Sequence, residues 1–319
     1  MAGIDNFHSH GCPEVSCRLP IMNLIADWFT YLIYSALWRV IRWLPEKSAY
    51  GIFEFGAKYA YRRDGKRVRR LRENYRRVRP TISSDDLESM VRAGLSNAMR
   101  YWCDTFRISD WTPQDAIAAC SSTNEDLLIN SMKSGKGVIV AVPHAGNWDH
   151  AGYYYCAIGF PVHTVAEHLK PDRLFRKFLK HRERMGMTVL DLDTKTLPEL
   201  TTFLETGQLV ALVSDRDLSR SGIDVDFFGA NARMPAGPAL LAYTTDALLV
   251  TAYVGYRNDG IHITWRGPLR VDKSRPRDEE VYRITQEMAK NFERDIDADP
   301  TSWHMQQRIF VAADSGNRS

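Results

Sequence analysis

The chain has 319 residues, enough for one large domain or two small ones, and 44% of them are hydrophobic. The mean hydropathy is −0.35, and no uncharged apolar run reaches about 18 residues, so the pattern of a transmembrane helix is missing. The net charge of +3 is small, and the five scattered cysteines, an odd number, favour reduced thiols in a cytosolic compartment over a disulfide framework.

The first 21 residues show no hydrophobic periodicity, and we expect them to form a disordered extension. Four potential metal ligands lie here: His8, His10, Cys12 and Cys17. Their spacing matches no common zinc motif, so we predict no metal site. We expect one domain over residues 22–312 and a disordered tail over residues 313–319.

An aromatic stretch, Trp28–Trp38, lies within a helix predicted over Asn23–Leu44. It is too short to cross a bilayer, which needs about 20 apolar residues. Tryptophan and tyrosine rings next to Arg39 and Arg42 are typical of a helix at the membrane interface. The alternative is a core helix packed on the domain. We favour an N-terminal amphipathic helix that contacts the membrane, and some packing is compatible with that.

A strongly basic segment follows over residues 58–79, opposed only by Asp64 and Glu73. Its basic residues are Lys58, Arg62, Arg63, Lys66, Arg67, Arg69, Arg70, Arg72, Arg76, Arg77 and Arg79. Such a segment can bind nucleic acid, attract anionic lipid headgroups or form a solvated helical face. The neighbouring aromatic stretch favours an anionic membrane surface, and no zinc finger, RNA-recognition or helix-turn-helix pattern supports a nucleic-acid partner.

The remaining elements predict an α/β fold with a mixed central sheet and helices on both faces. A helix begins near Ser83 or Ser84 and runs toward Phe106, before the first clear strand. Strands and helices alternate after it. The predicted strands are 138–142, 162–166, 187–192, 209–213, and a hairpin of 248–256 with 261–265 around Asn258-Asp259-Gly260. Phe227-Phe228-Gly229 is predicted to be a loop.

The segment Val138–Asp149 carries the first candidate site. A buried strand is ended by Pro143, and His144 follows, before a tight turn in which Asn147 is a good N-cap. Five residues turn a continuous helix by about 500°, so His144 and Asp149 meet only if His144 lies on the loop. Asp149 would then hold one ring nitrogen and leave the other as a general base. No protein nucleophile completes a triad, so the nucleophile belongs to the substrate.

Two more acidic residues follow predicted strands: Glu167 and Asp215. The carboxyl ends of strands commonly line the site of an α/β fold, so we expect His144, Glu167 and Asp215 to converge. Arg233 precedes a proline-glycine helix start and is a candidate contact for phosphate or coenzyme A.

These motifs resemble those of a known family. His144-x4-Asp149 is similar to the HX4D motif of the lysophospholipid acyltransferase superfamily. Together with Val165–Pro171, Asp226–Gly229 and Arg233–Pro238, it resembles the actinobacterial phosphatidylinositol mannoside acyltransferases, relatives of the lipid A lauroyl/myristoyl acyltransferases. The likeness runs from about Met22 to the end of the C-terminal helix and implies a glycerolipid-acyltransferase-like fold.

The resemblance implies that palmitoyl-CoA is the donor, and that the acceptor is the 6-hydroxyl of the mannose on inositol position 2 of a phosphatidylinositol mannoside. It implies no cofactor besides the acyl-CoA co-substrate, and a peripheral location on the cytoplasmic face of the cell membrane. His144 is the expected base and Asp149 its partner. Glu167, Arg182 and Asp215 match positions that line the acceptor site, although the family typically has glutamate where this chain has Asp215.

Other functions stay open at this point. Another glycolipid or a lysophospholipid can be the acceptor. A hydrolase would need a nucleophile, but the sequence has no G-x-S-x-G elbow and Ser214 is the only tempting serine. A non-catalytic, basic membrane- or nucleic-acid-binding protein would not depend on His144.

Overall fold

A computed structural model describes residues 19–166, 170–192, 195–217 and 222–311. Residues 1–18 of the expected disordered extension 1–21, the expected tail 313–319 and Glu167 therefore lie outside the described residues, whereas residues 19–21 belong to the first helix. None of the described helices is both long enough and apolar enough to cross a membrane.

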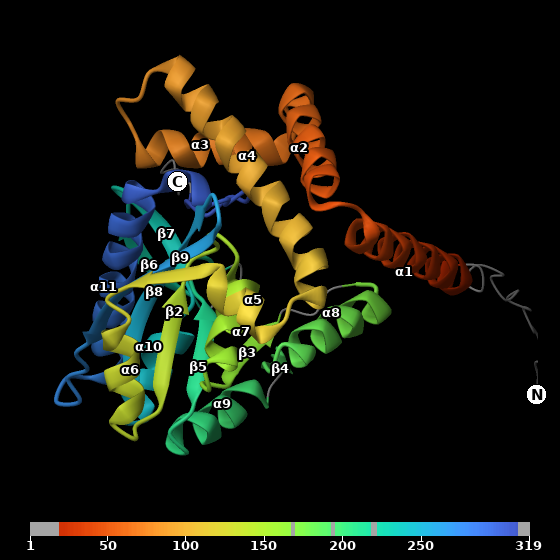
Figure 1. Cartoon of the computed structure of the whole chain (residues 1–319). Helices are drawn as coiled ribbons and strands as arrows, with labels where there is room; N and C mark the ends of the chain where they lie inside the picture. Colours follow the sequence, from red (N-terminus) through yellow and green to blue (C-terminus); the bar gives the residue numbers. More distant parts are fainter. Residues whose placement is uncertain (1–18, 167–169, 193–194, 218–221, 312–319) are drawn as a thin grey trace, which may run out of the picture.

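The described part of the chain begins with four long helices, of which α3 and α4 lie above the sheet in Figure 1 while α1 extends away from it. They are α1 (Leu19–Trp43), α2 (Glu46–Arg63), α3 (Lys66–Val78) and α4 (Ser84–Arg107). The predicted N-cap of α4 is confirmed, because the Ser83 hydroxyl accepts a hydrogen bond from the Asp86 backbone N–H at 3.1 Å.

The second half of α1 packs on the domain. Trp38 is buried, and its ring centroid lies 5.1 Å from that of Phe106 in α4 and 5.1 Å from that of Phe178 in α8 (Asp172–Arg184). Other large side chains along the helix stay exposed, among them Phe29, Leu32 and Trp43. Core packing and an exposed apolar surface are therefore both features of this helix.

The predicted mixed α/β architecture is confirmed by a seven-stranded sheet of order β1-β9-β8-β2-β5-β3-β4. The strands are β1 (Cys120–Thr123), β2 (Val138–Val142), β3 (Val162–Ala166), β4 (Thr188–Asp191), β5 (Leu209–Val213), β8 (Leu248–Arg257) and β9 (Gly260–Leu269). All neighbours pair in parallel except β8 and β9, which form the predicted antiparallel hairpin.

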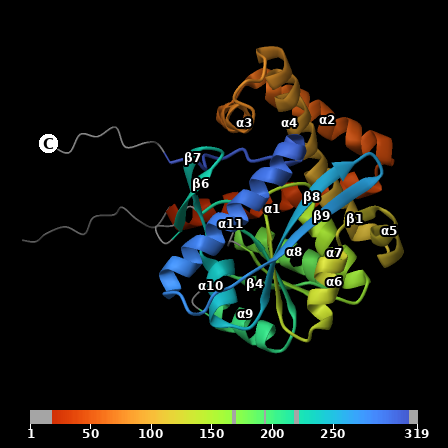
Figure 2. The ribbon, with the colours of Figure 1, turned by 90° about the vertical axis from the view of Figure 1, so that its left-hand side faces the viewer.

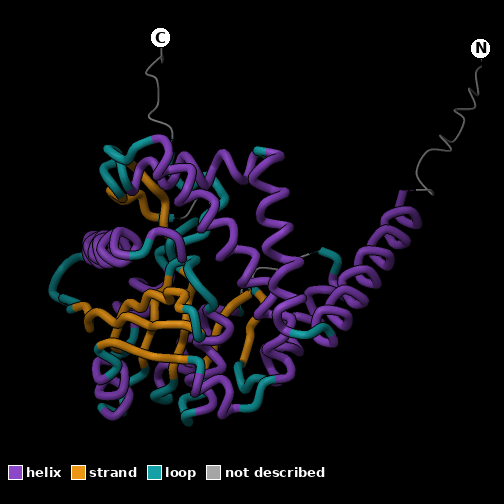
Figure 3. Tube along the Cα trace, turned by 45° about the horizontal axis from the view of Figure 1, so that its top comes forward, coloured by secondary structure: helices purple, strands orange, loops and turns teal. Residues whose placement is uncertain are grey.

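Helices cover both faces of this sheet, as the rotated ribbon (Figure 2) and the tube (Figure 3) show. They are α5 (Pro113–Ala118), α6 (Asp126–Lys133), α7 (Trp148–Ala157), α9 (Thr196–Glu205), α10 (Gly237–Thr244) and α11 (Arg277–Ala298). Side chains of β2 alternate between the faces. Ile139 and Ala141 join the core with α9, α10 and α11, whereas Val138, Val140 and Val142 join the core with α6 and α7.

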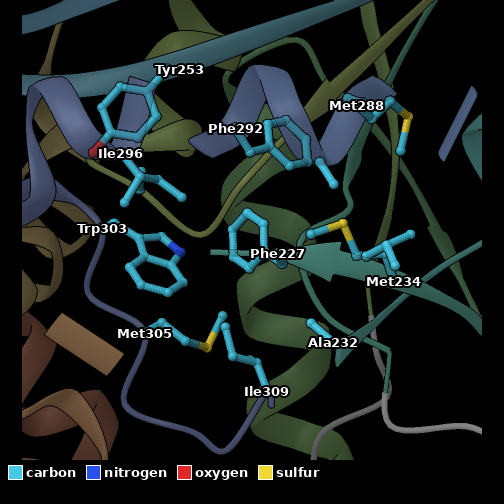
Figure 4. Close-up of a cluster of buried hydrophobic side chains, with 14 of the residues drawn as sticks. Phe227, Ala232, Met234, Tyr253, Met288, Phe292, Ile296, Trp303, Met305 and Ile309 are labelled. Carbon is cyan, nitrogen blue, oxygen red and sulfur yellow. The ribbon is translucent and has the colours of Figure 1, made fainter. Parts of the chain in front are cut away.

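The structure also contains strands that we did not predict. β1 extends the edge of the main sheet, and β6 (Ile223–Phe227) with β7 (Ala230–Met234) forms a separate two-stranded sheet. Phe228 and Gly229 form the turn between them, as predicted, but Phe227, which was predicted in the same loop, is the last residue of β6. Figure 4 shows Phe227 packed between Trp303 and Met234, so this small sheet anchors the segment that follows α11.

The contact between α3 and α4 gives a test of the packing. A Cβ on Gly94 would lie 2.1 Å from the hydroxyl of Tyr75, which is itself held by a hydrogen bond to the Trp303 carbonyl at 3.1 Å. We expect Gly94→Ala to lower the free energy of unfolding by about 1–3 kcal/mol. Gly51→Ala in α2, where no atom lies within 4 Å, should raise it by about 0.5–1 kcal/mol. Urea denaturation followed by circular dichroism measures both, and equal effects would contradict the packing.

Candidate active site

Two neighbouring parallel strands position the central pair of the site. β2 and β5 pair in register, with Val142 opposite Val213. His144 and Asp215 each lie two residues beyond that last pair, so both emerge side by side at the carboxyl end of the sheet. The Ser214 N–H continues the ladder to the Val142 carbonyl at 2.8 Å. The expected convergence of these two strand ends is therefore observed for His144 and Asp215.

Asp215 holds the His144 imidazole. Its Oδ1 lies 2.5 Å from His144 Nδ1, and its Oδ2 accepts from the His144 backbone N–H at 3.0 Å. The Trp303 indole N–H donates to the same Oδ2 at 2.8 Å. Because an ionised carboxylate only accepts hydrogen bonds, Nδ1 carries the ring proton and Nε2 is the basic nitrogen of the neutral ring.

The carboxylate of Asp215 is fully buried, whereas the His144 side chain is 29% exposed. Burial alone would raise the pKa of Asp215, but the His144 ring and the donors from Trp303 and the backbone lower it below its usual value. Asp215 is therefore a buried anion next to the His144 ring, and another part of that ring is open to solvent.

A tight turn carries His144 into helix α7. Gly146 has a φ of +56°, and a Cβ there would lie 2.3 Å from the Val254 carbonyl oxygen, so only glycine fits. Its N–H donates to the Ser302 carbonyl at 2.8 Å. The predicted cap at Asn147 is confirmed, because its Oδ1 accepts from the His150 N–H at 2.9 Å.

The structure corrects the predicted contact between Asp149 and His144. Asp149 is 3% exposed and accepts from Arg182 Nε at 2.7 Å and from the Tyr101 hydroxyl at 3.0 Å. It lies in the first turn of α7 and faces α8 and α4, while Asp215 occupies the Nδ1 side of the imidazole. The five-residue spacing thus brings Asp149 close to the loop that carries His144, but it does not bring its carboxylate into contact with the His144 ring.

Arg182 lies on α8 and its guanidinium binds both oxygens of Asp149, with Nη2 3.4 Å from Oδ2. Burial alone would lower the pKa of Arg182, but Asp149 and Tyr101 raise it above its usual value. The ion pair therefore stays charged and ties α7 to α8, while Tyr101 adds α4.

An aromatic group lies beside His144. The rings of Tyr101 and Trp148 stack with centroids 4.5 Å apart, and His304 stacks on Trp148 at 5.8 Å. Trp148 also meets His144 edge to face at 5.7 Å. Burial lowers the pKa of His304 to about 4, so its neutral ring donates from Nε2 to the Gly146 carbonyl at 3.1 Å. Trp148 and His144 are the half-buried side chains of this turn.

The other predicted site residues have separate places. Arg233 lies on β7 and pairs with Asp224 of β6, with Nε 2.7 Å from Oδ1. Glu167 lies outside the described residues. Among the residues that the structure describes, no group of three or more histidine, cysteine, aspartate or glutamate side chains could hold a metal ion.

Sequence reasoning missed Trp303, His304 and Tyr101. Trp303 is fully buried and reaches Asp215 only because the chain after α11 returns over the end of the sheet. No local pattern in the sequence marks that return. The sequence motif that begins at His144 includes Trp148, but the motif does not indicate that the Tyr101 ring stacks on Trp148.

Comparisons with known proteins show the family to which the chain belongs. Residues 19–311 match the family described as bacterial lipid A biosynthesis acyltransferase. A phosphatidylinositol mannoside acyltransferase of Mycolicibacterium smegmatis is 36% identical over 307 residues, which cover 95% of this chain and 97% of that protein. A protein of the same name from Mycobacterium tuberculosis strain H37Rv is 33% identical over 306 residues, covering 94% of this chain and 93% of its own.

The Asp149–Arg182 pair predicts a structural cost. Asp149→Asn leaves a buried guanidinium without its anion, which should lower the free energy of unfolding by about 3–5 kcal/mol. Adding Arg182→Met should recover part of that loss, because no unpaired charge then remains. Asp246→Asn is the control: this carboxylate is 82% exposed, so its solvent-screened pair with Lys273 should contribute far less to stability than the buried pair. Similar losses for Asp149→Asn and the control in chemical denaturation would contradict the buried pair.

His304 predicts a pH dependence. Its folded pKa of about 4 lies below its usual value of 6.5, so between these pH values the unfolded chain binds a proton that the folded chain does not. Stability therefore falls as pH falls through this window. We expect His304→Gln to reduce the difference in unfolding free energy between pH 6.5 and pH 4.5 by about 1–2 kcal/mol. Urea titrations at both pH values measure that difference, and an unchanged one would refute a neutral His304 ring.

Proposed function

Because the chain belongs to the bacterial lipid A biosynthesis acyltransferase family, we propose that it transfers a fatty acyl group from acyl-CoA to a hydroxyl of a phosphatidylinositol mannoside. The chain is an acyltransferase of glycolipid biosynthesis; the donor, the palmitoyl chain and the 6-hydroxyl of the mannose on inositol position 2 are our proposal. The hydrogen-bonded His144–Asp215 pair is the single observation on which the mechanism depends.

The proposed mechanism needs no protein nucleophile. Nε2 of His144 removes the proton from the attacking hydroxyl, whose oxygen forms the new bond to the thioester carbonyl carbon. Asp215 stabilises the imidazolium across Nδ1. When the tetrahedral intermediate collapses, the C–S bond breaks and His144 returns the proton to the thiolate. A positioned base of this kind contributes about 10²–10⁴-fold in rate.

We assign different tasks to the two aspartates. Asp215 orients and charges the base, whereas Asp149 positions Arg182 and the start of α7. Glu167 directly follows β3 in the sequence, and Arg182 lies on α8, the next helix. We retain both as proposed acceptor-site residues. Arg233 is retained as a weaker candidate for a phosphate of the donor, because its guanidinium already pairs with Asp224.

Exposed apolar side chains on α1 and α2 support a membrane-bound acceptor. They are Trp28, Phe29, Leu32, Ile33, Tyr34, Leu37, Val40, Trp43, Ile52, Phe55 and Tyr59. Ile52, Phe55 and Tyr59 follow the spacing of one helix face. We propose that this surface enters the cytoplasmic leaflet interface and that the basic α3 adds attraction to anionic lipids.

The hydrolase alternative loses its candidate nucleophile. Ser214 is fully buried, and its hydroxyl donates to the Leu212 carbonyl at 2.9 Å. It makes no hydrogen bond to His144 among the described residues, which is the contact that an activated serine needs. Transfer to an external hydroxyl is therefore the function that the geometry supports best.

Acyl transfer to a purified acceptor tests the proposal. With radiolabelled palmitoyl-CoA and phosphatidylinositol mannoside, His144→Gln should lower kcat by about 10²–10⁴-fold with a normal fold. His262→Gln, on the hairpin strand β9 and bonded to Ser121 and Thr123, is the matched control and should retain full activity. Transfer by His144→Gln at the control rate would overturn the base assignment. Acylation of another lipid alone would keep the base and overturn the acceptor.

A further inference from the structure

An arginine-lined cavity of about 710 Å³ lies between α3 and the segment that follows α11. Its basic side chains are Arg70, Arg76 and Arg77 from α3 and Arg308 from the C-terminal segment. Phe228 and Phe310 provide aromatic surface in the same cavity. Residues distant in sequence therefore build one basic and partly aromatic hollow, and none of its lining residues belongs to the His144 site.

The positive charge in this cavity is poorly neutralised. Glu73 is the acidic lining residue, and it pairs with Arg70 at 3.1 Å. Within the described ranges, Arg76, Arg77 and Arg308 have no carboxylate within 4.0 Å. Three guanidinium groups thus share one concave site, where like charges repel one another unless an anion is present.

The walls of the cavity are held firmly. The buried amide of Asn74 donates to the carbonyls of Met305 at 2.8 Å and Gln307 at 3.0 Å, which fastens the C-terminal segment to α3. Nε of Arg308 donates to the Phe310 carbonyl at 3.2 Å. The Arg77 guanidinium lies 4.9 Å from the centroid of the Phe310 ring. The arginines are therefore partly pre-organised before any ligand arrives.

We propose that this cavity is a second ligand site, which binds a phosphate group that carries an apolar or aromatic body. Guanidinium forks match phosphate oxygens in two-point hydrogen bonds, and the phenyl rings of Phe228 and Phe310 offer surface for the attached body. A soluble phosphate compound and the headgroup of an anionic lipid share this chemistry. The inference does not depend on the acyl transfer assigned to His144.

Paired charge-removing variants test the proposal. Arg76→Gln/Arg77→Gln/Arg308→Gln removes three charges from the cavity. Arg270→Gln/Lys273→Gln/Arg277→Gln removes three from exposed positions that neither line it nor belong to the proposed membrane surface. Binding of inorganic pyrophosphate and of 3′,5′-ADP is measured by calorimetry. Flotation with vesicles of phosphatidylinositol in phosphatidylcholine tests the lipid source, and pure phosphatidylcholine vesicles are the background.

We expect the cavity variant to bind at least about tenfold more weakly than the control variant, because several charge-assisted hydrogen bonds are lost. A selective loss of pyrophosphate or 3′,5′-ADP binding supports a soluble phosphate ligand. A selective loss confined to phosphatidylinositol vesicles supports a headgroup. Equal losses in both variants, or no binding of any probe by the wild type, would overturn the site. Because binding is read without acyl transfer, failure of the proposed acyltransferase reaction would be a separate result.

Discussion

The parallel pairing of β2 with β5 is the constraint on which the site depends. Backbone hydrogen bonds hold Val142 opposite Val213, and both strands end at the same level. His144 and Asp215 each lie only two residues beyond this pair, which brings their side chains into contact. A shift of one residue in this register would send one of the two side chains to the other face of the sheet. The relative position of His144 and Asp215 is therefore set by the backbone pairing of the two strands.

Burial then gives each charged group its task. Asp215 has no exposed surface, yet its two oxygens accept hydrogen bonds from His144 and Trp303. These contacts lower the pKa of its carboxyl group, so the negative charge is retained next to the imidazole. Asp149 is also buried, but its partners belong to α8 and α4. The two aspartates near the His144 turn thus have different roles, because Asp215 contacts the proposed base and Asp149 contacts the permanently charged guanidinium of Arg182.

Much of this arrangement was predictable from residue patterns. The apolar runs 138–142 and 209–213 are strands, and His144 and Asp215, two residues after the end of each, lie where the ordinary rule for α/β folds places site residues. The pairing of His144 was not predictable, because local spacing shows Asp149 nearby but carries no information on which distant strand lies alongside. The alternation Ile223–Phe227 is the pattern of a half-buried strand, so β6 was within reach of sequence reasoning. Trp303 was not, since its place depends on the path of the chain after α11.

The most direct test of the account is nitrogen NMR of the His144 ring in wild type, Asp215→Asn and Asp149→Asn. We expect the wild type to carry its proton on Nδ1, with Nε2 as the free base, because Asp215 accepts there. Asp215→Asn should change that tautomer, while Asp149→Asn should preserve it in the molecules that remain folded. A tautomer that responds to Asp149→Asn and not to Asp215→Asn would contradict the account.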